Sequence, residues 1–137
     1  MIEVHLLSMY LPSLSVGALL KRMSIAALQG VGLGFLLVGF VISWVPGFEG
    51  HLVGLSLVGI GWCYVFVTAT TLVARSRSGA ERFRAQGVND LCVFAASGAA
   101  SLFSGALLSA LGWSGLLHLG VVLVASLMAL AWNVHRA

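Results

Sequence analysis

Few side chains in this sequence of 137 residues could carry acid–base chemistry. Asp90 directly precedes a long apolar run, and Asn89 stands beside it. An ionisable group next to so apolar a stretch is a candidate for proton coupling or for an ion pair, because an unpaired charge there is costly. We favour a gating or structural ion pair with Lys21 or Arg22, since Asp90 lies at the edge of the run, where water can reach it.

A nucleophile and a base are also present, namely Ser104 and His118. An intramembrane hydrolase would need them within hydrogen-bond reach, together with an oxyanion hole. The GxSG frame is absent, because Leu102 and Phe103 precede Ser104, so we reject this class of function and expect no enzyme. His118 is interpreted as an interfacial residue near the end of a span.

Metal and cofactor chemistry find no support in the sequence. Cys63 and Cys92 form no CxxC motif and no cluster with histidine. A zinc site or a disulfide framework needs such spacing. We therefore expect no metal and no cofactor, and interpret both cysteines as small packing residues.

The amino-acid composition indicates that most of the surface of this chain faces lipid rather than water. Apolar residues make up 60% of the sequence and charged residues only 8%, and the mean hydropathy is +1.07. A soluble domain carries about 25% charged residues. The net charge of +3 does not indicate nucleic-acid binding, because the basic residues occur as short interruptions between apolar runs rather than as one patch.

The apolar runs predict five membrane-spanning helices in an all-α polytopic bundle that forms one domain. After Asp90, no Asp, Glu, Lys or Arg occurs before Arg136. One helix of about 45 residues would be roughly 68 Å long, more than a bilayer can hold, so the chain must turn, and residues 112–115 (GWSG) give the turn signal. The predicted helices are 4–20, 24–44, 51–74, 80–111 and 116–133.

Charge distribution predicts the orientation of these helices. With five spans, all seven Lys and Arg residues fall on one side of the membrane, and Glu3 and Glu49 fall on the other. Basic loops stay in the cytoplasm. We therefore expect a multi-pass protein of the bacterial inner (plasma) membrane with its N-terminus outside and its C-terminus in the cytoplasm.

Small residues predict where helices approach closely, because lipid provides no hydrophobic drive for association. The fourth predicted helix carries a stripe at four-residue spacing. The second and third carry glycine pairs at the same spacing, Gly30 with Gly34 and Gly50 with Gly54. The fifth is bulky and apolar on all sides, so we expect it to face lipid. The four residues of the stripe are Ser97, Ser101, Gly105 and Ser109.

The order of several short motifs resembles the major facilitator superfamily (MFS) of bacterial transporters. The motifs are MYLPS at 9–13 with GALLKR at 17–22, GIGWCYVFV at 59–67, ERFRAQGVND at 81–90, and the pairs Ser104-Gly105 and Gly112-Trp113. They resemble, in order, the family's helix eight with its following loop, helix ten, and helix eleven. Two positions depart from the family pattern: Lys21 replaces a frequent acidic residue, and Cys63 replaces an expected Asn.

The resemblance implies helices eight to twelve of a twelve-helix transporter, a partial MFS fold without the N-terminal half. Residues 51–74 would then line the cavity, which makes Trp62, Tyr64 and Thr68 candidates for substrate contact. The alternative is that these side chains only pack against a neighbouring helix, with their polar atoms satisfied there.

Two functions remain open from the sequence. The first is a segment of a secondary active transporter for a small molecule, which needs the other half because the substrate site lies between the halves. The second is a stand-alone membrane subunit that packs against another membrane protein through helix 80–111. The expected partners are therefore the lipid bilayer, an unidentified small-molecule substrate, and either the missing half or another membrane protein, and we expect no nucleic acid.

Overall fold

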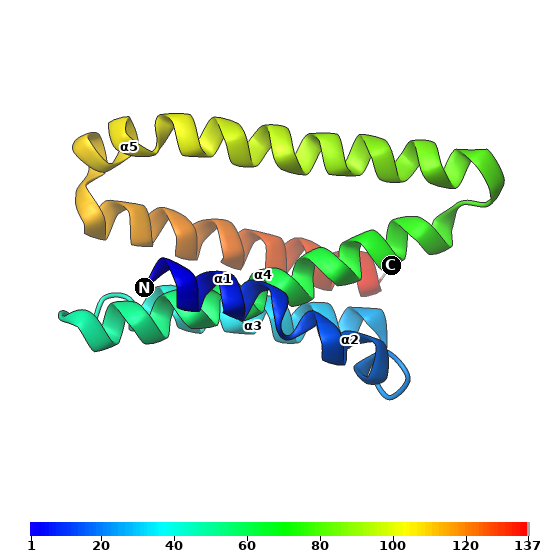
Figure 1. Cartoon of the computed structure of the whole chain (residues 1–137), viewed down its shortest axis with the longest axis horizontal. Helices are drawn as coiled ribbons and strands as arrows, with labels where there is room; N and C mark the ends of the chain where they lie inside the picture. The colour runs from blue at the N-terminus through cyan, green and yellow to red at the C-terminus, as the bar shows by residue number, and fades with distance from the viewer. Residues whose placement is uncertain (137) are drawn as a thin grey trace. The chain divides into compact units, whose positions relative to one another are not determined.

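The computed structural model describes the backbone of residues 1–136 and the side chains of residues 1–133. Every regular element in this range is a helix: α1 (Ile2–Tyr10), α2 (Ser13–Leu19), α3 (Ile25–Ile42), α4 (Phe48–Ser76) and α5 (Gly79–Arg136) (Figure 1). Four stretches are long and apolar enough to cross a membrane, namely Ile2–Leu19, Ile25–Ile42, Phe48–Ser76 and Gly79–Asn133. The predicted all-α membrane helix bundle is confirmed.

The chain divides into two compact units. The first combines residues 1–68 with residues 117–137, and the second comprises residues 69–116. α1, α2, α3, most of α4 and the last part of α5 belong to the first unit. The end of α4 and the longer part of α5 belong to the second.

Pro12 separates α1 from α2 without ending the first apolar stretch. Proline cannot donate a backbone hydrogen bond, so a helix that contains one must satisfy carbonyl groups by other means. At this bend the Ser13 hydroxyl donates to the carbonyl of Tyr10, and the Ser15 hydroxyl donates to the carbonyl of Pro12. α3 begins more regularly, with the Ser24 hydroxyl accepting from the amide of Ala27 at 3.1 Å.

α3 and α4 pack through glycines seven residues apart. A Cβ on Gly61 would lie 2.7 Å from the carbonyl oxygen of Gly32, and one on Gly39 would lie 2.8 Å from the carbonyl oxygen of Gly54. All four of these glycines are buried. The backbones of α3 and α4 therefore approach each other closely at two positions along the helix pair.

Gly30 and Gly34 do not take part in this contact. A Cβ at either position would meet nothing within 4 Å. Four-residue spacing selects a different stripe of the helix from seven-residue spacing, and the seven-residue spacing suits the small crossing angle of left-handed pairs.

The other helices of the first unit attach to this pair. α1 contacts α4 where Nδ1 of His5 donates to the carbonyl of Leu55 at 2.8 Å. The last part of α5 contacts α3: Val124 joins Leu33 and Leu36 in a buried cluster. Val122 and Leu123 on the opposite face of α5 are exposed. This segment therefore has one packed face and one exposed face.

α5 is interrupted at Gly112, whose φ of 65° and ψ of 177° are not helical. The break lies inside the predicted turn 112–115. A Cβ on Gly115 would lie 2.8 Å from the Cβ of Leu111, so the two sides of the break are tightly apposed. As one straight helix, the stretch Gly79–Asn133 would be about 80 Å long, well beyond the thickness of a bilayer.

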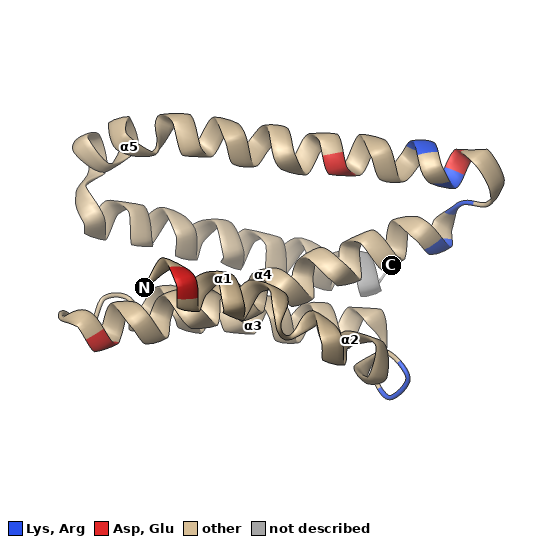
Figure 2. Ribbon diagram, in the orientation of Figure 1, with Lys and Arg blue, Asp and Glu red and all other residues tan. Residues whose placement is uncertain are grey.

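Most of the charged residues lie near helix ends, whereas Asp90 lies within α5 (Figure 2). α4 carries Glu49 in its first turn and Arg75 in its last turn, an arrangement that also suits the helix dipole. Lys21 and Arg22 lie in the connection between α2 and α3. Arg136 was predicted on the same side as these cations, but its side chain lies outside those that the structure describes.

Candidate functional site

The three candidate cavity residues on α4 do not point the same way. Trp62 is 37% exposed and stacks on Phe66, with ring centroids 6.2 Å apart and an interplanar angle of 15°. Tyr64 faces α3, where its ring lies 6.1 Å from that of Phe35. Of these aromatic residues, Trp62 is therefore the one whose ring is open to a ligand.

Thr68 is fully buried, with a relative exposure of 0%. Its hydroxyl donates to the carbonyl of Tyr64 at 2.6 Å and also to the carbonyl of Val65 at 3.0 Å. A hydroxyl bonded to its own helix in this way needs no other partner. The geometry of Thr68 suits a packing role better than substrate contact.

Asn89 and Asp90 form a local pair in the second unit. The Asn89 side-chain amide donates to Oδ1 of Asp90 at 3.2 Å, and both residues are half-buried. Lys21 and Arg22 are exposed and belong to the first unit. An ion pair between either of them and Asp90 stays a prediction.

The stripe of small residues on α5 is open. Ser97, Ser101, Gly105 and Ser109 are all exposed, and a Cβ on Gly105 would meet nothing within 4 Å. The hydroxyl of Ser109 donates to the carbonyl of Ala106 at 2.9 Å, so its hydrogen-bonding need is met within α5. The stripe thus offers a surface on which a helix backbone could lie closely.

The two residues considered for hydrolysis are engaged elsewhere. The Ser104 hydroxyl donates to the carbonyl of Ser101 at 2.7 Å. The His118 ring packs edge-on against Trp44, with centroids 4.9 Å apart. Among the side chains that the structure describes, none acts as a base bonded to the Ser104 hydroxyl, which a nucleophilic serine would need.

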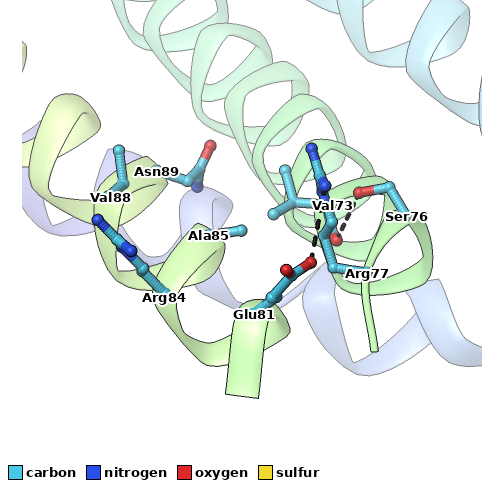
Figure 3. A pocket seen from close by; sticks show the side chains of 8 residues that line it. All are labelled: Val73, Ser76, Arg77, Glu81, Arg84, Ala85, Val88 and Asn89. Carbon is cyan, nitrogen blue, oxygen red and sulfur yellow. Dashed lines mark hydrogen bonds and ion pairs between the residues drawn. The ribbon is translucent and has the colours of Figure 1, made fainter. Parts of the chain in front are cut away.

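The connection between α4 and α5 contains two pockets that the sequence analysis did not identify. The larger, of about 550 Å³, lies beside an ion pair in which Arg77 and Glu81 are 3.7 Å apart (Figure 3). Asn89, whose side-chain amide donates to Asp90, also lines this pocket. Its lining residues are Val73, Ser76, Arg77, Glu81, Arg84, Ala85, Val88 and Asn89.

The smaller pocket, of about 370 Å³, is lined by Thr70, Thr71, Ala74, Arg75, Arg82 and Gln86. The smaller pocket takes Arg75 from the last turn of α4, the larger takes Arg77 from the connection that follows α4, and each takes a second arginine from the start of α5. The signal in the sequence was the matched spacing of Arg75 with Arg77 and of Arg82 with Arg84 on either side of a short turn. In the sequence these arginines could bind anionic lipid headgroups, although their role in setting the topology is enough to explain them.

Helical spans, charged connections and an open helix face define the class of this protein as a multi-pass membrane helix bundle. Comparison with curated proteins shows which kind of membrane protein the chain is similar to. The chain is 38% identical over 114 residues to a riboflavin transporter of Brucella anthropi, and this alignment covers 82% of the chain and 28% of that transporter. It is 34% identical over 125 residues to an uncharacterised MFS-type transporter of Bacillus subtilis, covering 89% of the chain and 29% of that protein.

The chain is therefore homologous to a segment of MFS-type transporters, as its motifs indicated. It spans less than a third of the length of the two curated relatives that it matches. No family model matches the sequence, and no solved structure matches it.

Proposed function

We propose that this chain contributes five membrane-spanning helices to a secondary transporter of the MFS type, which moves a small organic molecule across the membrane. The observation that carries the proposal is the identity of 38% to a riboflavin transporter over most of the chain. The apolar helices support it, because transporters of this kind are built from spanning helices around a central site.

The proposed topology has the N-terminus outside and the C-terminus in the cytoplasm. The break at Gly112 divides α5 into a fourth and a fifth span. With five spans, the basic connections that follow α2 and α4 lie on one side, and the acidic ends near Glu3 and Glu49 lie on the other. Basic loops are usually retained in the cytoplasm, which supports this direction.

Transport by this chain would require further helices, whether in the same polypeptide or in a partner. A substrate site between two halves cannot be enclosed by five helices alone. The exposed stripe of Ser97, Ser101, Gly105 and Ser109 is the surface that we assign to those helices. Asp90 and the cations Lys21 and Arg22 are the charged residues that we assign to gating at the cytoplasmic rim.

A chimeric transporter tests the proposed function. In the riboflavin transporter of Brucella anthropi, the aligned segment would be replaced by the aligned 114 residues of this chain. We expect the chimera to restore growth of a riboflavin auxotroph at low riboflavin. A chimera that inserts at the normal level but takes up no riboflavin would contradict the proposal that this segment can serve in such a transporter, and failure to reach the membrane in folded form would contradict the shared fold.

Two substitutions in the same chimera separate cavity residues from packing residues. Trp62→Ala should lower riboflavin uptake about tenfold, because stacking of an aromatic ligand on an exposed ring contributes roughly 0.5–1.5 kcal/mol beyond the buried area. Thr68→Val should leave uptake within about twofold, because the Thr68 hydroxyl is bonded to its own helix. Equal losses in the two variants would show that Trp62 has no special part in binding.

The alternative function is a stand-alone membrane subunit that binds another membrane protein through α5. The same stripe would then form the interface. Purification of the chain from native membranes in mild detergent discriminates between the two. A stable complex with a protein unrelated to transporters would favour the subunit, and recovery with transporter helices would favour our proposal.

A further inference from the structure

We propose that the pocket lined by Arg75 and Arg82 binds the phosphate group of an anionic phospholipid in the cytoplasmic leaflet. This proposal rests on the membrane topology given above but not on transport. Its ligand is a lipid headgroup, and its site lies entirely within the second unit.

The pocket brings cations from two helices together. Arg75 comes from the last turn of α4, and Arg82 comes from the first turn of α5. Gln86 lies one turn beyond Arg82 on the same face of α5 and adds an amide donor. Two guanidinium groups and an amide supply several N–H donors, and arginine matches the geometry of phosphate oxygens in pairs.

No carboxylate lines this pocket among the residues that the structure describes. The neighbouring pocket differs, because Glu81 contributes to its wall and pairs with Arg77 at 3.7 Å. The carboxylate of Glu81 offsets the charge of Arg77 in that pocket. An anion should therefore favour the pocket of Arg75 and Arg82 over the pocket of Arg77 and Arg84.

The position of the pocket along α4 selects a lipid as the occupant. Thr70, Thr71 and Ala74 lie in the last two turns of a 29-residue span, and Arg75 follows them directly. The end of a spanning helix on the cytoplasmic side meets the headgroups of the inner leaflet, which contains anionic lipids that attract basic juxtamembrane residues. A phosphate held here can remain attached to acyl chains that lie beside α4.

The positive-inside rule alone would explain why residues 75 and 82 are positively charged, but it would not explain why both are arginine. Lysine serves the positive-inside rule equally well, whereas it binds phosphate as a point charge without a planar fork. The double variant Arg75→Lys/Arg82→Lys should therefore keep the membrane topology and lose the proposed recognition of phosphate. Arg84→Lys, in the neighbouring pocket, is the matched control.

The test titrates the full purified chain in detergent with phosphatidylglycerol or phosphatidylcholine and counts bound lipids by native mass spectrometry. We expect phosphatidylglycerol to bind at least about tenfold more tightly than phosphatidylcholine. The R75K/R82K variant should lose about fivefold or more of that preference, whereas R84K should keep it. Millimolar inorganic phosphate should not displace the lipid.

Three results would overturn the proposal. The first is equal binding of the two lipids by the unchanged chain. The second is an R75K/R82K variant that keeps the full preference, or an R84K variant that loses as much. The third is displacement of the lipid by inorganic phosphate, which would assign the pocket to a free phosphate instead.

Discussion

Replacing Gly61 with leucine is expected to separate α3 from α4 and to unfold the first unit. Even the Cβ of the new side chain would lie 2.7 Å from the carbonyl oxygen of Gly32 and 2.7 Å from the amide nitrogen of Leu36. These are backbone atoms and cannot rotate away. Overpacking a tight contact costs about 1–3 kcal/mol, and occasionally more, and a clash with backbone belongs at the upper end of that range.

Gly34→Leu is the control for this prediction. Gly34 lies on α3 as well, but a Cβ there would meet nothing within 4 Å. The thermal midpoint of each variant in detergent, measured by tryptophan fluorescence, compares the two. We expect a large decrease for G61L and almost none for G34L. Similar midpoints for both variants would contradict the seven-residue glycine contact.

Replacing Gly112 with alanine is expected to disturb the last membrane crossing. A φ of 65° with a ψ of 177° is a conformation that is essentially restricted to glycine, and a side chain there costs about 1–3 kcal/mol. Alanine also favours continuation of the helix, which would create a helix too long for the bilayer. The new residue therefore opposes the turn in two ways.

A reporter fused to the C-terminus measures this effect. In the unchanged chain the reporter should be cytoplasmic, and in G112A a substantial fraction should be found outside or degraded. Gly98→Ala is the control, because Gly98 lies within α5 and a Cβ there would meet nothing within 4 Å. A G112A chain with the same reporter distribution as G98A would show that the turn does not depend on Gly112.

The positions of the long apolar helices could be predicted from hydropathy for a physical reason, whereas the count of five spans stays a prediction. A bilayer requires long uninterrupted apolar helices, so the runs that become α3 and α4 are visible in the sequence before any packing is known. The observed bounds Ile25–Ile42 and Phe48–Ser76 lie close to the predicted 24–44 and 51–74. The turn around Gly112 was visible because glycine stands where the chain must leave the helix.

The packing of these helices was predicted less well, because small residues are common on every face of a membrane helix. α3 offers glycines at 30, 32, 34 and 39, and spacing alone does not say which of them meets α4. The pair that packs, Gly32 with Gly39, is separated by seven residues rather than four. Selection between these registers depends on the partner helix, whose Gly54 and Gly61 have the same spacing.

The candidate site, like the fold, could be predicted only in part. The exposure of the Trp62 ring agrees with a ligand-contacting role, but the bonds from Thr68 to the carbonyls of Tyr64 and Val65 could not be predicted from residue types alone. The arginine pockets could not be predicted, because they depend on how the end of α4 faces the start of α5. Pairing of Asp90 with Lys21 or Arg22 depends on residues from both units and stays a prediction.

Labelling of single cysteines in intact cells tests most directly the claim that α5 forms two spans and that the chain crosses the membrane five times. The native Cys63 and Cys92 would be replaced by alanine, and one cysteine would be introduced at Glu49, at Ser78 or at Ser114. A membrane-impermeant maleimide should label positions 49 and 114 from outside and should reach position 78 only after permeabilisation. Labelling of position 78 from outside, or protection of position 114, would contradict the topology on which the proposed function depends.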